Sequence, residues 1–342
     1  MSIANRYRVA AIVPCHNEEV AVAKVVRDLY AAVPGITVYV YDNCSTDSTA
    51  ERAREAGAVV CHEPLKGKGN VVRRAFADID ADIYLLIDGD DTYDAFAAPA
   101  MLDRLVSDNL DQVVGVRRQV EGLETSAYRP NHEMGNKLLN RIVCSIFGDS
   151  MGDMLSGYRV FSRRFVRSFP AVSREFEIET ELTVHSLALR IPSATVHVDF
   201  RDRQEGSESK LRTYRDGWRI LNVILTLTRH ERPIYFYGLL SGILMLAAGA
   251  LGVPVIAEYL ATGQVPRFPS LIVSAFLVMI ACLYSMVGLI IDGQRKSRHE
   301  VSRLSYMRHP AVRGTYVSDP MPDRETLAHV DASPVAPLAQ AG

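Results

Sequence analysis

The chain has 342 residues and a formal net charge of −2, with 38 lysines and arginines against 40 aspartates and glutamates. This length allows about two domains, and the near-neutral charge gives no overall attraction to nucleic acid, so no nucleic-acid partner is expected. The five cysteines are scattered and form no C-x-x-C pair, which favours a reducing compartment over a disulfide framework or a zinc site. The first apolar run, 9–13, is too short for a signal peptide.

Strand-like and helix-like segments alternate over roughly the first 230 residues. Short apolar runs predict strands at 9–13, 37–41, 58–60, 83–87 and 112–116. Helical patterns occupy about 18–32, 45–57 and 173–190, and the second of them has cap residues at its start and Gly57 at its end. Near-continuous apolar strands that alternate with helices predict an α/β fold with a mainly parallel sheet covered on both faces.

Polar residues follow several of the predicted strands. Asn17 and Glu18 come just after the first strand, Asp42 ends the second, and Asp88 follows the run at 83–87. In open α/β sheets, ligands bind beyond the carboxyl ends of the strands. The sequence therefore predicts a ligand site at this edge of the sheet.

The stretch YLLIDGDDTYD (84–94) places four aspartates within seven residues at the end of an apolar strand. A calcium loop of the EF-hand type would need Gly and Glu where Tyr93 and Pro99 stand, so that interpretation fails. A solvated acidic turn remains one interpretation. The other is a divalent cation that bridges Asp88 and Asp90 to a diphosphate, since Mg²⁺ commonly binds one or two carboxylates together with substrate phosphates. The position of this D-x-D pair at a strand end favours the cation.

The stretch LKGKGNVVRRA (65–75) is rich in glycine and lysine. Val72 stands where a dinucleotide fingerprint needs its third glycine, so a nicotinamide or flavin enzyme is not expected. Lys66 and Lys68 either border an anionic ligand or belong to a basic surface loop, and the sequence leaves both interpretations open.

Two segments, Ile234–Ala257 and Phe268–Ile291, contain no charged residue and are long enough to span a bilayer. A buried helical hairpin in a soluble protein is the alternative. Basic residues flank the pair on both outer sides: Arg229, His230, Arg232, Arg295, Lys296 and Arg298. The positive-inside rule therefore predicts a cytoplasmic location for both flanks and for the large N-terminal region.

The segments on either side of the predicted spans have their own patterns. In LRTYRDGWRILNVILTL (211–227), apolar residues recur at helical spacing opposite a basic stripe, which predicts an interfacial amphipathic helix or a helix packed on the soluble domain. Beyond about residue 310 the chain is rich in proline and lacks an apolar period, which predicts disorder.

Five stretches together resemble the family 2 glycosyltransferases that act on polyprenyl phosphates. They are IVPCHNEE (12–19), YDNCSTD (41–47), LLIDGDD (85–91), DMLSGYRVFSRR (153–164) and EGSESKLRTYRDG (205–217). This resemblance implies a GT-A fold, a UDP- or GDP-linked sugar donor, a Mg²⁺ or Mn²⁺ ion and a lipid-phosphate acceptor, which in a bacterium is undecaprenyl phosphate. It also implies a homo-oligomer, namely a tetramer.

The resemblance assigns roles to individual residues. The donor would be held by Pro14, Asn17, Glu18, Asp42 and Asp88, and the metal by Asp88 and Asp90. Lys68 of the glycine-rich stretch is a further candidate for donor binding on account of its charge. Asp153 matches the residue usually taken as the general base, although a phosphate acceptor is already mostly ionised at neutral pH and barely needs one; a role in positioning the SGYR turn is the alternative. Candidate ligands for the acceptor phosphate are Arg117, Arg129, Arg203, Ser207 and Lys210.

A processive polysaccharide synthase would be expected to carry a Q-x-x-R-W motif, but the only tryptophan, Trp218, follows Gly217. A transferase with a saccharide acceptor and a non-enzymatic nucleotide-sugar-binding membrane protein remain alternatives. The prediction is an inverting, metal-dependent transfer of one sugar at the cytoplasmic face of a bacterial plasma membrane. The expected division of the chain is a GT-A domain (1–210), a juxtamembrane helix (211–232), a two-helix multi-pass anchor (233–295) and a largely disordered cytoplasmic tail (296–342).

Overall fold

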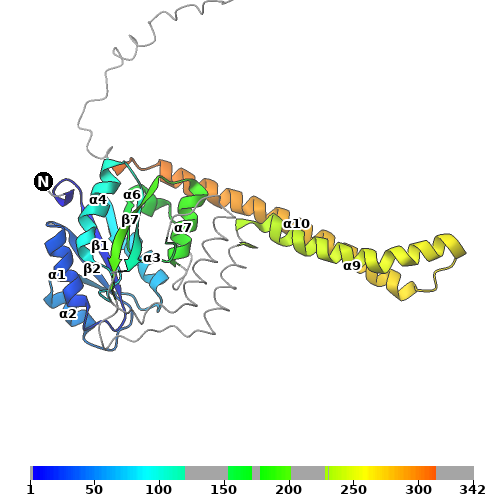
Figure 1. Ribbon diagram of the computed structural model, residues 1–342, viewed down its shortest axis with the longest axis horizontal. Helices are drawn as coiled ribbons and strands as arrows, with labels where there is room; N and C mark the ends of the chain where they lie inside the picture. The colour runs from blue at the N-terminus through cyan, green and yellow to red at the C-terminus, as the bar shows by residue number, and fades with distance from the viewer. Residues whose placement is uncertain (1–2, 120–152, 172–177, 202–227, 230, 313–342) are drawn as a thin grey trace, which may run out of the picture.

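The computed structural model describes residues 3–119, 153–171, 178–201, 228–229 and 231–312. A sheet flanked by helices forms one end of the molecule, and two long helices project from it as a hairpin (Figure 1). Within the described residues, seven strands form one sheet in the order β3-β2-β1-β4-β6-β5-β7. The strands are β1 Val9–Cys15, β2 Thr37–Asp42, β3 Val59–His62, β4 Ile83–Leu86, β5 Gln112–Gln119, β6 Arg159–Ser162 and β7 Ser193–Phe200.

The sheet is mainly parallel, as the sequence predicts. β1 pairs in parallel with β2 and β4, and β5 pairs in parallel with β7. β6 is antiparallel to both β4 and β5, so β5 again runs in the direction of β4. The carboxyl ends of β1, β2, β4 and β5 therefore lie at one edge of the sheet, and the segment that enters β6 starts from that same edge.

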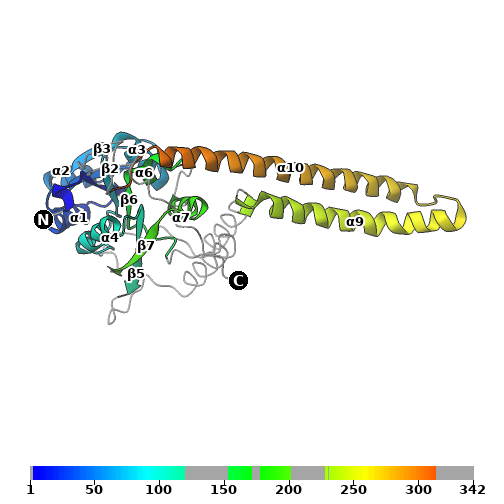
Figure 2. The same ribbon diagram turned by 90° about the horizontal axis from the view of Figure 1, so that it is seen from above.

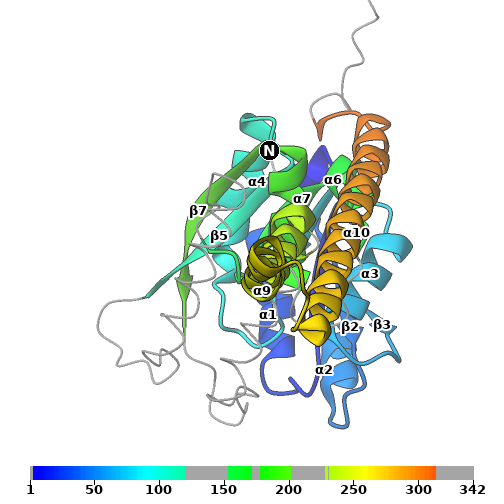
Figure 3. The same cartoon turned by 90° about the vertical axis from the view of Figure 1, so that its right-hand side faces the viewer.

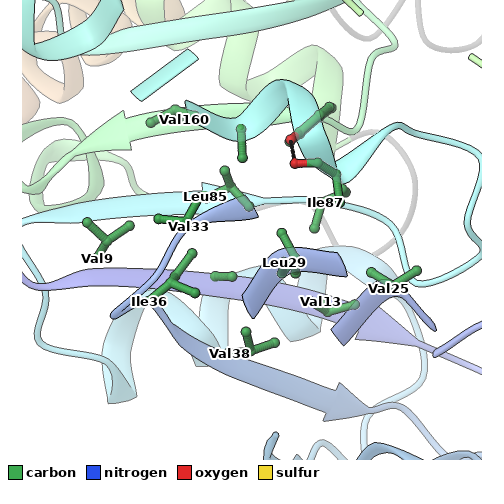
Figure 4. Close-up of a cluster of buried hydrophobic side chains, with 14 of the residues drawn as sticks. Val9, Val13, Val25, Leu29, Val33, Ile36, Val38, Leu85, Ile87 and Val160 are labelled. Carbon is green, nitrogen blue, oxygen red and sulfur yellow. Dashed lines mark hydrogen bonds between the residues drawn. The ribbon is translucent and has the colours of Figure 1, made fainter. Parts of the chain in front are cut away.

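Successive side chains of a strand point to opposite faces of the sheet. Helices cover both faces, so both sets of side chains are buried. On one face, Val9, Val13 and Leu85 pack against the helix that carries Val25 and Leu29 (Figure 4). That layer contains α1 Val22–Ala32, α2 Thr49–Glu55 and α4 Ala98–Ser107; the other contains α3 Lys68–Asp78, α6 Arg163–Ser168 and α7 Ile178–Leu189. This double coverage explains the near-continuous apolar strands of the sequence.

Two predicted helices begin later than expected. α1 begins at Val22 rather than near residue 18, and α2 at Thr49 rather than at residue 45. The intervening residues are used in contacts between the two loops: the backbone N–H of Glu18 donates to the Thr49 hydroxyl at 2.9 Å, and that of Thr46 donates to Asn17 Oδ1 at 2.8 Å. These cross-loop hydrogen bonds take the place of a first helical turn.

The hairpin consists of α9, Pro233–Thr262, and α10, Phe268–Met307. Both are long and apolar enough to cross a membrane, and only 22% and 17% of their most apolar windows are buried. A hairpin in a soluble core would be mostly buried, so the exposed faces favour the membrane interpretation. The two helices lie side by side along most of their length (Figures 2 and 3).

Small residues line the contact between α9 and α10. Buried positions recur every seven residues: Ser241, Ala248 and Val255 on α9, and Ser274, Ala281 and Gly288 on α10. The hydroxyl of Ser241 donates to the Ala281 carbonyl at 2.8 Å, and that of Ser274 donates to the Ala248 carbonyl at 2.9 Å. Close helix contact through small residues and interhelical hydrogen bonds is typical of membrane helices.

α10 does not end at residue 295, where the membrane anchor is predicted to end. α10 continues as a helix to Met307, so the beginning of the segment predicted to be a disordered tail is ordered. The physical reason is tertiary packing, because this part of α10 contacts α6 and α7. Residues 313–342 and most of the predicted juxtamembrane helix lie outside the described residues, and the other domain boundaries stay predictions.

Candidate active site

The carboxyl edge of the sheet gathers most of the predicted donor residues that the structure describes. Pro14 lies near the end of β1, opposite Tyr41 of β2, and the next pair in register is Cys15 and Asp42. Asp42 is buried; its Oδ1 accepts from the Ser45 N–H at 3.2 Å, and its Oδ2 lies 3.2 Å from His62 Nδ1. Asn17 and Glu18 reach the same loop through the hydrogen bonds described above. The four predicted donor residues of β1 and β2 are thus together.

Three non-glycine residues at this edge adopt left-handed backbone conformations. They are Asn17 with φ of 57°, Cys44 with φ of 60° and Asp91 with φ of 56°, one at the end of each of β1, β2 and β4. Such conformations cost free energy for residues with a Cβ atom and cluster at functional sites. Their gathering at one edge agrees with the placement of a ligand site there.

Asn43 is a residue that the sequence reasoning did not single out. Its Nδ2 donates to the carbonyls of Glu63 at 2.9 Å and Leu65 at 2.8 Å, and its Oδ1 accepts from the Gly67 N–H at 2.7 Å. The side chain is buried, and these three bonds satisfy most of its capacity. Asn43 therefore fixes the turn that leads into Lys68. Its sequence signals are its position directly after Asp42 at a strand end and its place within the YDNCSTD stretch.

The acidic turn after β4 divides its carboxylates between different partners. Asp90 is buried, and its Oδ1 accepts from the Thr92 hydroxyl at 2.6 Å and from the Thr92 N–H at 3.2 Å. Asp91 lies 2.7 Å from Lys24 of α1. Asp88 forms an ion pair with Lys68. Lysines thus offset part of the repulsion between these aspartates.

Lys68 is the centre of a buried charge cluster. Its ammonium pairs with Asp88 and also with Glu179 of α7, at 2.6 Å, and both Lys68 and Glu179 side chains are less than one-tenth exposed. Burial alone would lower the pKa of Lys68, but the two carboxylates outweigh it and raise the pKa above the usual range. A Cβ atom at Gly157 would collide with the Asp88 carboxylate and the Lys68 ammonium, so a larger residue there would require this ion pair to shift. Glu179 is a second residue that the sequence analysis missed.

The D-x-D pair fits a divalent cation that takes part of its ligands from the protein and the rest from a substrate. No cluster of three His, Cys, Asp or Glu side chains suited to a metal occurs within the described ranges. Two carboxylates are enough for Mg²⁺ or Mn²⁺ when phosphate oxygens and water supply the remaining ligands. Oxygen donors are what such hard cations prefer, and the second oxygen of Glu179 is buried without a hydrogen-bond partner near the Lys68–Asp88 pair. The donor set therefore suits a metal–diphosphate unit.

Arg117 and Asp153 form the second charged pair at this edge. Arg117 near the end of β5 donates through Nε to Asp153 Oδ2 at 2.5 Å and through Nη2 to Oδ1 at 2.9 Å. The guanidinium also lies 5.4 Å from the centre of the Phe200 ring. Asp153 is buried, whereas the Arg117 side chain is 27% exposed. The predicted general base and a predicted phosphate ligand are thus bound to each other.

A fully buried arginine supports the turn that carries Asp153. Arg159 of β6 donates to the carbonyls of Met154 at 2.6 Å and Ser156 at 2.9 Å, and to the Thr183 hydroxyl at 2.9 Å. Burial lowers the pKa of Arg159 to about 10, so the guanidinium stays charged at neutral pH. The arginine in the SGYR stretch therefore orders the backbone beside Asp153.

The remaining predicted acceptor residues lie outside the described residues: Arg129, Arg203, Ser207 and Lys210. Their roles stay predictions.

His185, which the sequence predicts to be a packed residue, does pack: its Nε2 lies 2.9 Å from the Ser168 hydroxyl, and its ring meets Phe165 and Phe169 edge-on.

Comparisons with known proteins identify relatives of this chain. The family model for glycosyl transferase family 2 matches residues 10–168. Glycosyltransferase AglJ of Haloferax volcanii is 34% identical over 289 residues, which cover 83% of this chain and 92% of AglJ. The chain belongs to glycosyltransferase family 2. The matched segment contains the D-x-D turn, Arg117, Asp153 and Arg159.

Other similar proteins extend the picture of this glycosyltransferase. A dolichyl-phosphate hexose transferase of Haloferax volcanii is 29% identical over 65% of this chain and 95% of its own length. Among solved structures, glucosyl-3-phosphoglycerate synthase from Mycobacterium tuberculosis, in complex with Mn²⁺, UDP and glucosyl-3-phosphoglycerate, matches with a TM-score of 0.53 and 22% identity, over 66% of this chain and 81% of that chain. The GT-A fold expected for the glycosyltransferase is confirmed.

Proposed function

We propose that the glycosyltransferase moves one hexose from a nucleotide sugar to a polyprenyl phosphate, which is undecaprenyl phosphate in a bacterial membrane. The observation that carries the proposal is the Arg117–Asp153 pair, which adds a guanidinium at the same edge of the sheet as the D-x-D turn in a chain with two exposed apolar helices. A lipid phosphate needs both features, because its headgroup is anionic and its tail lies in the bilayer. The related dolichyl-phosphate hexose transferase supports this acceptor class.

The donor side of the proposal rests on the β1, β2 and β4 ends. Asp42 and its neighbours would hold the nucleoside, and Asp88 and Asp90 would hold Mg²⁺ or Mn²⁺ together with the diphosphate. A divalent cation bound there would neutralise the charge that develops on the leaving diphosphate. Lys68 would lie beside the same phosphates as a fixed positive charge, because Glu179 would still hold its ammonium if Asp88 bound a cation.

The acceptor side of the proposal begins at Arg117. Its planar guanidinium can bind phosphate oxygens bidentately, as it now binds Asp153. On arrival of the acceptor, Arg117 exchanges a carboxylate oxygen for a phosphate oxygen and stays anchored by the other. Asp153 then acts mainly by aiming Arg117, since the phosphate, with a second pKa of about 6, needs little help from a base. Direct attack by the phosphate oxygen on the anomeric carbon forms the new glycosidic bond as the bond to the nucleoside diphosphate breaks, and the configuration at that carbon is inverted.

The setting of the reaction is also part of the proposal. The basic flanks of α9 and α10 support a cytoplasmic catalytic domain under the positive-inside rule, with the hairpin in the plasma membrane. The homotetramer implied by the family resemblance is proposed as the oligomeric state.

A panel assay tests the proposed function. The purified protein is incubated with Mn²⁺, undecaprenyl phosphate and each of several UDP- and GDP-linked hexoses, and the lipid fraction is analysed by mass spectrometry. One glycolipid that carries a single hexose is expected from one donor. Glycolipids with several hexoses, or transfer only to an added saccharide, would contradict the single transfer to a lipid phosphate.

A further inference from the structure

α10 is longer than a bilayer requires. Its 40 residues form one helix of about 60 Å, whereas about 20 residues cross the hydrocarbon core. His299 Nε2 lies 3.6 Å from Glu231 Oε2, just before the start of α9, so His299 marks the base of the hairpin. The part of α10 beyond His299 therefore extends along the catalytic domain, as the end of the helix next to α6 shows (Figure 2).

The end of α10 is held by a buried carboxylate. The Tyr306 hydroxyl donates to Asp111 Oδ2 at 2.6 Å, and the Arg164 guanidinium lies 4.6 Å from the centre of the Tyr306 ring. Asp111 is fully buried and also accepts from Arg164 Nε at 2.5 Å and Nη2 at 2.6 Å, and from the Ser162 hydroxyl at 2.6 Å. Hydrogen bonds to an ionised acceptor are stronger than neutral ones, so this contact is strong for its size.

The carboxylate that holds Tyr306 also adjoins β5, the strand that carries Arg117. Asp111 directly precedes β5, and Arg117 lies near the other end of that strand. Ser162, another partner of Asp111, ends β6, whose first residue is Arg159. A helix that leaves the bilayer is thus fastened to the two strands that carry the acceptor side of the site. Val312, just past α10, is buried in the core on the opposite face of the sheet and adds a second attachment.

We propose that the part of α10 from Asp292 to Met307 is a rigid strut that fixes the catalytic domain relative to the bilayer, with Tyr306 as its positioning residue. The inference rests on the proposed function, since it matters only for an acceptor whose headgroup stays at the membrane surface. Without the Tyr306 contact the domain can tilt on α10, and Arg117 no longer meets a headgroup at a constant height.

Hydrogen–deuterium exchange of the full-length protein in lipid nanodiscs tests the strut itself. Tyr306→Ala is expected to speed amide exchange in residues 300–307 by at least about tenfold, because the contact that holds this segment opens. Tyr306→Phe keeps the ring on Arg164, so its amide exchange rate is expected to lie between those of the wild type and Tyr306→Ala. It serves as the test variant if Tyr306→Ala fails to fold. Tyr259→Phe, an exposed tyrosine at the far end of the hairpin, is the control. Unchanged exchange in the Tyr306 variant would overturn the proposal.

Two acceptors test the consequence for transfer. With long-chain undecaprenyl phosphate in bilayers, Tyr306→Ala is expected to lower turnover about tenfold, since small misplacements of reacting groups are costly. With a short-chain, water-soluble polyprenyl phosphate, turnover is expected to match wild type. An equal loss with both acceptors, or no loss with either, would overturn the positioning role. If the wild-type protein used neither acceptor, the proposed function would fail, and the exchange experiment would still decide whether the strut exists.

Discussion

Both carboxylate oxygens of Asp153 are occupied by the guanidinium of Arg117, at 2.5 Å and 2.9 Å. A side chain engaged in this way is well placed to aim an arginine at a phosphate and less well placed to remove a proton. The pair therefore bears directly on the role of Asp153.

Asp153→Asn is expected to raise the KM for the lipid acceptor about tenfold and to lower kcat by less than tenfold at pH 8. An asparagine keeps one oxygen for Arg117 but loses the charge that holds the pair, which typically costs about 1.5–3 kcal/mol. Steady-state kinetics with varied acceptor separate the two constants. A kcat loss of about 10²–10⁴ with an unchanged KM would instead identify Asp153 as the general base.

Asp90→Asn is expected to abolish turnover and to weaken Mn²⁺ binding in the presence of the nucleotide. The change removes one of two carboxylates from a site that depends on substrate phosphates for its other ligands. Electron paramagnetic resonance of bound Mn²⁺ and the glycolipid assay measure the two effects. Asp91→Asn, next in sequence but paired with Lys24, is the matched control and should retain most of the activity. Wild-type activity that survives excess EDTA would rule out the metal-dependent mechanism.

Lys68→Met is expected to lower the free energy of unfolding by about 3–5 kcal/mol, because it leaves Glu179 buried without its cation. Thermal unfolding in detergent measures the loss. Replacing both partners, in Lys68→Met with Glu179→Met, should recover part of the stability, and Lys66→Met in the same turn should have little effect because Lys66 is exposed. A double variant less stable than Lys68→Met would show that the pair is not the source of the effect.

Much of the site can be predicted from the sequence because buried parallel strands are recognised there as apolar runs with polar ends. This pattern alone predicts Asp42 and Asp88 at one edge of the sheet. The partnership of Lys68 with Glu179 could not be predicted, because it joins α3 to α7 and depends on how two helices pack on one face of the sheet.

The length of α10 shows the limit of composition-based reasoning. After Ile291 the sequence becomes highly charged, and nothing local distinguishes a solvated helix from a tail. The helix continues because Tyr306 meets Asp111, a residue far away in the sequence. Asn43 was missed for a similar reason, since its importance lies in three hydrogen bonds to a distant turn.

Arg203→Ala and Lys210→Ala are each expected to raise the KM for undecaprenyl phosphate at least tenfold. The headgroup carries a charge of about −1.5 to −2, and loss of one charged partner typically costs about 1.5–3 kcal/mol. Calorimetry with nucleotide alone should show little change. If both variants lost nucleotide affinity and kept lipid affinity, these residues would belong to the donor site instead.

Stability is expected to fall as the pH decreases from about 6.5 towards 4, because of His185. Burial, with a smaller contribution from His299, lowers its pKa from 6.5 to about 4, so the folded protein keeps the neutral ring while the unfolded chain takes up a proton. The contribution of neutral, buried His185 to the free energy of unfolding is on the order of 3 kcal/mol. It is fully present above about pH 6.5 and is lost as the pH falls towards 4.

Thermal unfolding across this pH range checks the effect of His185. His185→Gln should flatten the acid limb of the stability profile, whereas His197→Gln, at an exposed position of β7, should leave it unchanged. An acid limb that keeps its slope in His185→Gln would assign it to other groups.

Because α10 is uninterrupted, the number of residues between His299 and Tyr306 fixes both the distance and the direction of the tyrosine side chain. Each residue added between His299 and Tyr306 would advance the tyrosine by 1.5 Å and turn it by about 100° around the helix axis. One insertion would therefore point the ring away from Asp111, and seven would bring it back to nearly the same side but about 10 Å too far along. Insertions and deletions that a loop would absorb are consequently ruled out in this stretch, and grafting the catalytic domain onto another membrane anchor would require matching both the distance and the angular phase.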